Sequence, residues 1–207
     1  MSQTQAARSA GISRFGGHFA AGVLFVALLA SQAVARNAGS QSASPQSLDE
    51  SIAKLAKDCE GKNFGSCTIL AALYEGKKDM NKAVPLYIKG CDGGDGLGCE
   101  TLGELYAVGK GVPKDAGKAA AFFSKACDAG ISHGCSRLGY SYMHGHGVAQ
   151  DEARGAQLYQ KGCDMGDGLG CHNLSFAYEK GMGVPKDKDK AQEYKAKAIK
   201  AGYHEKK

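Results

Sequence analysis

Cysteine is the residue whose type and spacing most restrict the chemistry of this chain. The eight cysteines form four pairs, and seven residues separate the partners of every pair. Redox-active pairs usually have two intervening residues and a perturbed thiolate, and neither feature is indicated here. We therefore predict structural disulfides between sequence neighbours, with no free thiol. The predicted bonds are Cys59–Cys67, Cys91–Cys99, Cys127–Cys135 and Cys163–Cys171.

A second pattern that could do chemistry is Ser51-Ile52-Ala53-Lys54. It fits Ser-x-x-Lys, in which a serine nucleophile precedes a lysine in serine β-lactamases and penicillin-binding proteins. The accompanying Ser-Asp-Asn and Lys-Thr-Gly motifs are absent from the sequence. So short a pattern arises easily by chance on a lysine-rich helix, and we predict no catalytic residue. If β-lactam turnover exists, we expect it to be slow and to survive loss of Ser51.

Histidines offer little support for a metal centre. His144 and His146 form the one close pair, in a segment expected to be a loop, with Asp151 as the nearest acid. Two histidines and one acid do not make a catalytic zinc site. His133 and His172 adjoin cysteines, but those sulfur atoms should already be in disulfides. We therefore predict a solvated loop, with no metal and no cofactor.

The N-terminus predicts export. Residues 1–35 contain Arg8 and Arg14, no acid, an apolar segment from Ala20 to Ala30, and the small-x-small sequence Ala33-Val34-Ala35. The apolar segment is shorter than the ~20 residues that a membrane helix needs. We interpret residues 1–35 as a cleaved signal peptide. An uncleaved anchor and an organelle presequence are the alternatives. Export leads to an oxidising compartment, so we expect a secreted or periplasmic protein.

Charge excludes some partners. Residues 1–35 hold two of the 26 basic residues and none of the 21 acidic ones, so the remainder is only mildly basic. That balance argues against nucleic acid and against strong attraction to a membrane surface. We expect a monomer with no stable membrane insertion after cleavage. Residues 36–49 are rich in Ser, Gln and Ala and should form a flexible linker.

The cysteine pairs recur at offsets of 32, 36 and 36 residues, which indicates a repeat protein. Residues 118–130 and 99–109 illustrate the two helical patterns of each unit, with apolar residues at helical spacing. Asp115, Asp151 and Asp187 are placed as helix N-caps. Without strand-like alternation, we predict an all-α repeat domain over residues 50–207. Its units are 50–81, 82–117, 118–153, 154–189 and a half unit, 190–207.

A specific sequence frame runs through these units. Leu102-Gly103, Tyr106, Gly109-x-Gly111-Val112, Asp115 and Lys118-Ala119 resemble the Sel1-like repeat, a relative of the tetratricopeptide repeat. The frame returns 36 and 72 residues later, and the paired cysteines make it similar to the Helicobacter cysteine-rich protein family. Three departures stand out. Residues 75–79 replace the Gly-x-Gly-Val loop, Ser175 replaces the packing glycine, and Pro85 could kink its helix or delay its start.

The resemblance implies a right-handed α/α superhelix whose concave face is lined by the helix that begins at each second cysteine. Positions just after that cysteine and just before the frame tyrosine then point into a groove. The candidate binding residues are Glu100, Thr101, Glu104, Leu105, Arg137, Tyr140, Ser141, His172, Asn173 and Phe176. In the first and later units, Thr68, Ile69, Ala72, Leu73, Ser136 and Ala177 share those positions. We expect Tyr140, Phe176 and Leu105 to be exposed apolar contacts.

Two functions follow from these expectations. The first is an exported scaffold that binds a protein, peptide or cell-wall-related ligand in the groove. The second is implied by the resemblance alone. Members of the cysteine-rich family carry a β-lactamase or penicillin-binding label, so the alternative is a weak β-lactam hydrolase.

Overall fold

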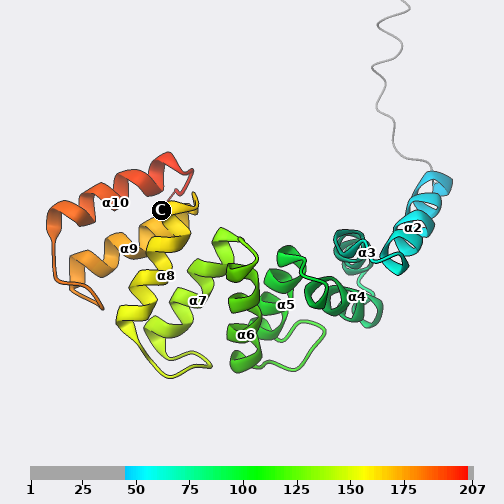
Figure 1. Cartoon of the computed structure of the whole chain (residues 1–207), viewed down its shortest axis with the longest axis horizontal. Helices are drawn as coiled ribbons and strands as arrows, with labels where there is room; N and C mark the ends of the chain where they lie inside the picture. The colour runs from blue at the N-terminus through cyan, green and yellow to red at the C-terminus, as the bar shows by residue number, and fades with distance from the viewer. Residues whose placement is uncertain (1–44, 205–207) are drawn as a thin grey trace, which may run out of the picture. The chain divides into compact units, whose positions relative to one another are not determined.

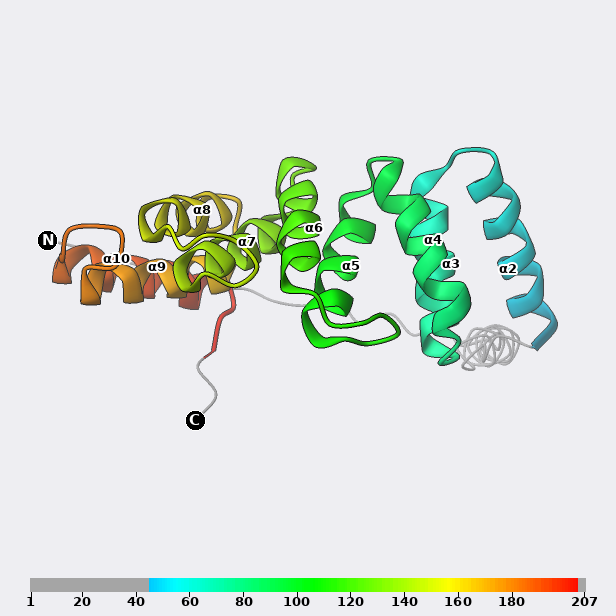
Figure 2. The same cartoon turned by 90° about the horizontal axis from the view of Figure 1, so that it is seen from below.

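The computed structural model describes residues 45–204, and the predicted signal peptide lies outside them. The described residues form helices joined by short loops, with no strand among them. Figures 1 and 2 show the helices following one another in chain order. The helices are α2 (Pro45–Glu60), α3 (Phe64–Gly76), α4 (Met80–Asp92), α5 (Gly96–Val108), α6 (Ala116–Asp128), α7 (Ser132–His144), α8 (Glu152–Asp164), α9 (Gly168–Lys180) and α10 (Lys188–Lys200).

Two boundaries differ from the sequence-based expectation. Helix α2 begins at Pro45, so residues 45–49 belong to it and not to the predicted linker. Proline is favoured at the first helical position, since the amide hydrogen that it lacks would have no helical partner there. Helix α4 begins at Met80 and continues through Pro85, so of the two expected effects of this proline, a kink or a late start, the late start is wrong. An N-cap explains the start, because the Asp79 carboxylate accepts a hydrogen bond from the Lys82 amide at 3.2 Å.

Aspartate caps begin the first helix of each later unit, as predicted. The carboxylates of Asp115 and Asp151 accept hydrogen bonds from the backbone amides three residues later, both at 2.9 Å. Asp187 does the same at 3.0 Å. These side chains satisfy amide groups that have no carbonyl partner within the helix. The sequence therefore sets where α6, α8 and α10 begin.

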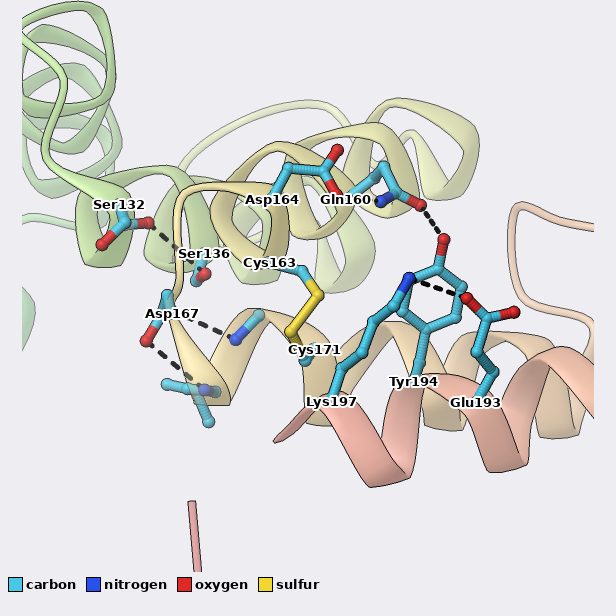
Figure 3. The surroundings of a disulfide bond; sticks show 12 residues. Ser132, Ser136, Gln160, Cys163, Asp164, Asp167, Cys171, Glu193, Tyr194 and Lys197 are labelled. Atoms are coloured by element: carbon cyan, nitrogen blue, oxygen red, sulfur yellow. Dashed lines mark hydrogen bonds and ion pairs between the residues drawn. A yellow bond between two sulfur atoms is a disulfide. The ribbon is translucent and has the colours of Figure 1, made fainter. Parts of the chain in front are cut away.

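Each disulfide closes the turn between two consecutive helices. The helices joined in this way are α2 and α3, α4 and α5, α6 and α7, and α8 and α9. All eight cysteines, which lie within the described residues, are in the four predicted bonds. Their Cα atoms are 4.5–4.8 Å apart, within the range that a disulfide requires. Figure 3 shows one of them, in which Cys163 of α8 is joined to Cys171 of α9. The predicted pairing is confirmed.

The helices pack most extensively in the pairs α3–α4, α5–α6, α7–α8 and α9–α10. Three of the disulfides therefore join one such pair to the next pair along the chain. The first disulfide joins α2 to the α3–α4 pair. Buried leucines connect successive pairs, since Leu102 of α5 clusters with Tyr87 of α4, and Leu174 of α9 clusters with Tyr159 of α8. The stapled all-α solenoid that the sequence predicts is the observed architecture.

Glycine 103 explains how closely α5 approaches α6. A Cβ atom on Gly103 would lie 2.5 Å from two ring atoms of Phe123, so only glycine leaves room for that ring. Ser175 holds the equivalent place in α9, and its hydroxyl donates a 2.7 Å hydrogen bond to the Ala191 carbonyl. Serine is tolerated there because the aromatic residue of the earlier units is replaced by exposed Lys195 in α10.

Candidate ligand-binding face

Most of the predicted binding residues, which lie on helices α5, α7 and α9, are at least partly exposed. Tyr140 and Phe176 are 43% and 48% exposed, although both are large and apolar. Glu104 is also exposed, and the remaining five are partly exposed. We define the α5–α7–α9 face by these eight residues: Glu100, Thr101, Glu104, Arg137, Tyr140, His172, Asn173 and Phe176.

The expectation is wrong for two residues. Leu105 is only 3% exposed and packs in a hydrophobic cluster with Leu102 and Tyr87. Ser141 is 6% exposed, and its hydroxyl donates a hydrogen bond to the Arg137 carbonyl. Both residues come six positions after a cysteine, and Ala177 at the same position is likewise buried. That position turns toward the neighbouring helix, because one further residue rotates the side chain by about 100° around the axis.

The residue directly after the second cysteine of each pair is alternately buried and partly exposed along the chain, which the repeat frame alone did not predict. Thr68 and Ser136 are buried, whereas Glu100 and His172 are partly exposed. Each of the two buried residues faces a glycine of the next helix in the chain, Gly90 of α4 for Thr68 and Gly162 of α8 for Ser136. A Cβ atom on Gly90 would lie 2.4 Å from the Thr68 hydroxyl oxygen. The sequence shows the same alternation at the facing position. Glycine stands opposite the buried residues, as Gly90 and Gly162, and alanine takes that position in the other two cases, as Ala126 and Ala198.

A group of charged side chains links the three helices of the face. His133 Nε2 lies 3.9 Å from Glu104 Oε1, and His133 Nδ1 lies 3.7 Å from Asp167 Oδ1. The Arg137 guanidinium also reaches Glu104, at 3.8 Å. The Asp167 carboxylate raises the pKa of His133, which favours the charged imidazolium. The histidine was set aside at the sequence level because of its neighbouring cysteine, but its side chain points to carboxylates.

The pKa values of the two nearby carboxyl groups are shifted in opposite directions. Desolvation raises the pKa of Glu100, which lies beside this group on α5. Desolvation also acts on Asp167, but the interactions with His133 and Ser136 outweigh it and lower the pKa of that carboxyl. Asp167 is in addition the N-cap of α9 and accepts a 3.1 Å hydrogen bond from the Gly170 amide. The charged group therefore fixes the start of α9 against α7.

A pocket of about 430 Å³ opens between α5, α6 and α7. We call it the central pocket. Its floor is apolar, and three of its lining side chains can carry positive charge, whereas none is acidic. The lining residues are Ala107, Val108, Lys114, Ala116, Ala119, Phe123, Arg137, Tyr140, Ser141 and His146. The arrangement suits a ligand that combines an apolar group with an anionic one.

Tyr140 connects the central pocket with the aromatic residues further along the face. Its ring lies 4.4 Å from the His144 ring and 5.4 Å from the His146 ring, measured between centroids. It also lines a smaller pocket of about 70 Å³, together with Asn173 and Phe176. Exposed aromatic surface therefore continues from α7 to α9.

The two remaining sequence patterns show no catalytic arrangement. The Ser51 hydroxyl donates to the Ser47 carbonyl at 2.7 Å, whereas the Lys54 ammonium group pairs with Asp58 at 3.3 Å. The histidines 144 and 146 pack against each other and Tyr140. Between residues 45 and 204, no group of three or more His, Cys, Asp or Glu residues is placed to hold a metal ion. No helix in that range has the length and apolarity to cross a membrane.

Comparison with known families gives a match that covers most of the chain. A family model described as the Sel1 repeat matches residues 66–95, 98–131, 132–167 and 168–203. These units begin near the second cysteine of each pair, so they differ in register from the units predicted above. They agree with the tightly packed helix pairs of the structure. A search of curated proteins found none that matches.

Solved structures of similar fold include proteins from three bacteria. The antigen c5321 of uropathogenic Escherichia coli strains is 26% identical, with a TM-score of 0.70, over 73% of this chain and 33% of the other. A Sel1 repeat protein of Oxalobacter formigenes is 27% identical, with a TM-score of 0.66, over 72% of this chain and 61% of the other. The chain thus spans less than two thirds of these two proteins. Cysteine-rich protein B of Helicobacter pylori is 32% identical, with a TM-score of 0.53, over 64% of this chain and 98% of that one.

Proposed function

Because the chain belongs to the Sel1 repeat family, we propose that it is an extracytoplasmic scaffold that binds a partner protein or peptide. The partner lies on the α5–α7–α9 face. Sel1 repeats generally mediate protein–protein interaction. The four disulfides support a location outside the reducing cytosol, in the periplasm or beyond it.

One observation carries the proposal. Tyr140 and Phe176 hold the same place in successive units, and both remain about half exposed beside a pocket. Aromatic side chains bury a large area on contact and lose little conformational freedom, so they often serve as anchors of an interface. A solvated helix position has no comparable need for them. The polar neighbours Glu104, Arg137 and Asn173 can orient a partner around these anchors.

Affinity capture tests this proposal. Oxidised protein covering residues 45–207 is immobilised and exposed to a periplasmic and secreted protein extract, and captured proteins are identified and purified. The Kd of a purified partner is then measured for wild type and for Tyr140→Ala/Phe176→Ala. We expect each aromatic truncation to cost about 1–3 kcal/mol of binding free energy, whereas circular dichroism of the free protein should be unchanged.

Met165→Ala serves as the matched control. Met165 is a large exposed apolar residue in the turn between α8 and α9 and lines none of the pockets described here. Its loss should leave the Kd unchanged. Equal affinity of wild type and of the double aromatic variant would place the interface elsewhere on the chain.

The alternative of β-lactam hydrolysis is not favoured by any arrangement described above. Ser51 and Lys54 have separate hydrogen-bond partners, and a covalent nucleophile needs an oriented base and an oxyanion hole nearby. The cell-wall ligand considered at the sequence level likewise has no specific feature in its favour. The scaffold function is therefore the one proposed.

A further inference from the structure

We propose that the central pocket binds the free C-terminal carboxylate of a partner polypeptide whose last residue is apolar. The inference rests on the proposed function, since it specifies the partner's chemistry at the same face. It comes from a comparison of three successive interfaces within the chain. Each interface is formed by the C-terminal end of one helix and the next two helices of the chain. The three sets of helices are α3, α4 and α5, then α5, α6 and α7, then α7, α8 and α9.

The first of these interfaces already contains a carboxylate. In the interface of α3, α4 and α5, Glu75 accepts a 2.7 Å hydrogen bond from the Tyr87 hydroxyl and a 2.8 Å one from the Lys110 ammonium group. The hydrogen bond from Lys110 is the largest cause that lowers the pKa of Glu75, so the carboxylate is charged. Leu105 packs in the same hydrophobic cluster as Tyr87.

In the second interface, the same frame position lacks that carboxylate. Eight residues after its cysteine, α5 has Ala107 where α3 has Glu75, and Ser141 replaces Leu105. Both changes remove side-chain volume, and the central pocket of about 430 Å³ results. His146 stands at the place of Lys110, so a side chain able to carry positive charge is kept. An entering carboxylate can therefore take the place that Glu75 occupies one unit earlier.

The third interface lacks both the space and the charge. Met143 stands where α5 has Ala107, and the equivalent pocket between α7, α8 and α9 has a volume of only about 70 Å³. Asn173 and Met182 replace Arg137 and His146, so these two cationic positions become neutral. Among the three interfaces compared, the central one alone combines an open pocket with several cationic side chains.

Charge and shape in the central pocket agree with a carboxylate on an apolar residue. Lys114, Arg137 and His146 line it without an acidic neighbour in the lining. Glu104 approaches Arg137 from outside, at 3.8 Å, yet Arg137 Nε has no hydrogen-bond acceptor among the described residues. Buried Phe123 and Ala119 form the apolar floor. A charge-assisted hydrogen bond to the carboxylate and an apolar contact can then form together.

The C-terminal residue of a polypeptide can carry both a carboxylate and an apolar side chain. Its α-carboxylate and its side chain leave the same carbon atom, whereas an internal Asp or Glu carries its carboxylate on the side chain itself. The residues that precede it can lie across exposed Tyr140 toward Phe176, because Tyr140 lines both the central pocket and the next one. A free small acid would leave these aromatic residues unused.

A peptide library made with two different C-terminal groups tests the proposal. The probes are fluorescent octapeptides with seven randomised positions and Leu or Phe last, each synthesised as a free acid and as a carboxamide. They are bound to the oxidised protein covering residues 45–207, and the sequences selected are remade in both forms. We expect at least about tenfold tighter binding of the acid, since a hydrogen bond to a charged group is among the stronger polar interactions.

Two substitutions of Ala107 introduce the residues that the neighbouring interfaces have at the equivalent position. Ala107→Met should fill the pocket as Met143 does in the next interface, and Ala107→Glu should supply an internal carboxylate as Glu75 does. Both should abolish the preference for the acid. Ala121→Met is the control, because Ala121 is exposed on α6 and does not line the pocket. Denaturant titration confirms that each variant is folded.

The outcomes separate this inference from the proposed function. Equal binding of acid and amide peptides, with loss on Tyr140→Ala, would overturn the carboxylate site and leave the peptide-binding face intact. Binding of N-acetylleucine as tight as that of the selected octapeptide would overturn the polypeptide partner. Absence of binding by every peptide at millimolar concentration would overturn the inference, whereas the protein-capture experiment still decides the proposed function.

Discussion

Removal of one internal disulfide should reveal how the helix pairs depend on each other. Cys127→Ala/Cys135→Ala breaks the bond between α6 and α7, in the middle of the described array. Both cysteines are buried, so the substitution removes little exposed surface and adds no unpaired polar group. The bond closes a loop with a sequence separation of 8 residues. In the chain-entropy model, opening so short a loop costs about 2–3 kcal/mol of the free energy of unfolding.

The assay is guanidinium denaturation followed by far-ultraviolet circular dichroism, with mass spectrometry to confirm that three disulfides remain. In addition to the loss of stability, we expect the transition to broaden. The disulfide joins two tightly packed pairs, and a repeat array unfolds through its units when the coupling between them is weakened. Hydrogen exchange should locate the earliest opening at the α6–α7 junction.

Cys59→Ala/Cys67→Ala is the matched control, because this bond has the same sequence separation of 8 residues. It joins α2 to α3 at one end of the described array, so its loss should increase exchange in α2 and leave the later helices protected. A change below about 0.5 kcal/mol for the central variant would refute the reasoning. So would identical exchange patterns in the two variants, since the position of the staple would then be irrelevant.

Two further outcomes are expected. Leu105→Ala should lower the free energy of unfolding by about 2–5 kcal/mol, as for other buried leucines, because Leu105 is 3% exposed; Glu104→Ala, measured in the same denaturation, should change it by less than about 0.5 kcal/mol. The raised pKa of His133 means that its stabilisation is complete below the unfolded-state value of about 6.5 and is lost as pH rises through the folded-state pKa. The stability difference between wild type and His133→Gln should therefore be larger at about pH 5.5 than at about pH 9, and a constant difference would contradict the interaction with Asp167.

The sequence by itself determined the repeat, the disulfides and the starts of α6, α8 and α10. A constant gap within each cysteine pair leaves little freedom, because two helices joined by a short turn bring these residues together wherever the gap recurs. The aspartate caps act on amides three residues away, as Asp115 does. Such features depend on local geometry, and local geometry follows from adjacent residues. Tyr140 and Phe176 are exposed, as their place in the repeat frame predicted, but the same frame also predicted exposure for Leu105, which is buried.

Only the tertiary structure decided which frame positions are open to a ligand. Leu105 and Glu104 are adjacent in sequence, yet one is buried against α4 and the other is exposed, because their directions relative to the neighbouring helices differ. His133 gains significance from carboxylates on α5 and at the start of α9, which are distant in sequence. The central pocket exists because Ala107 and Ser141, two residues of different helices, are both small at one place of contact. A pocket is space left by several elements at once, so no single segment of sequence specifies it.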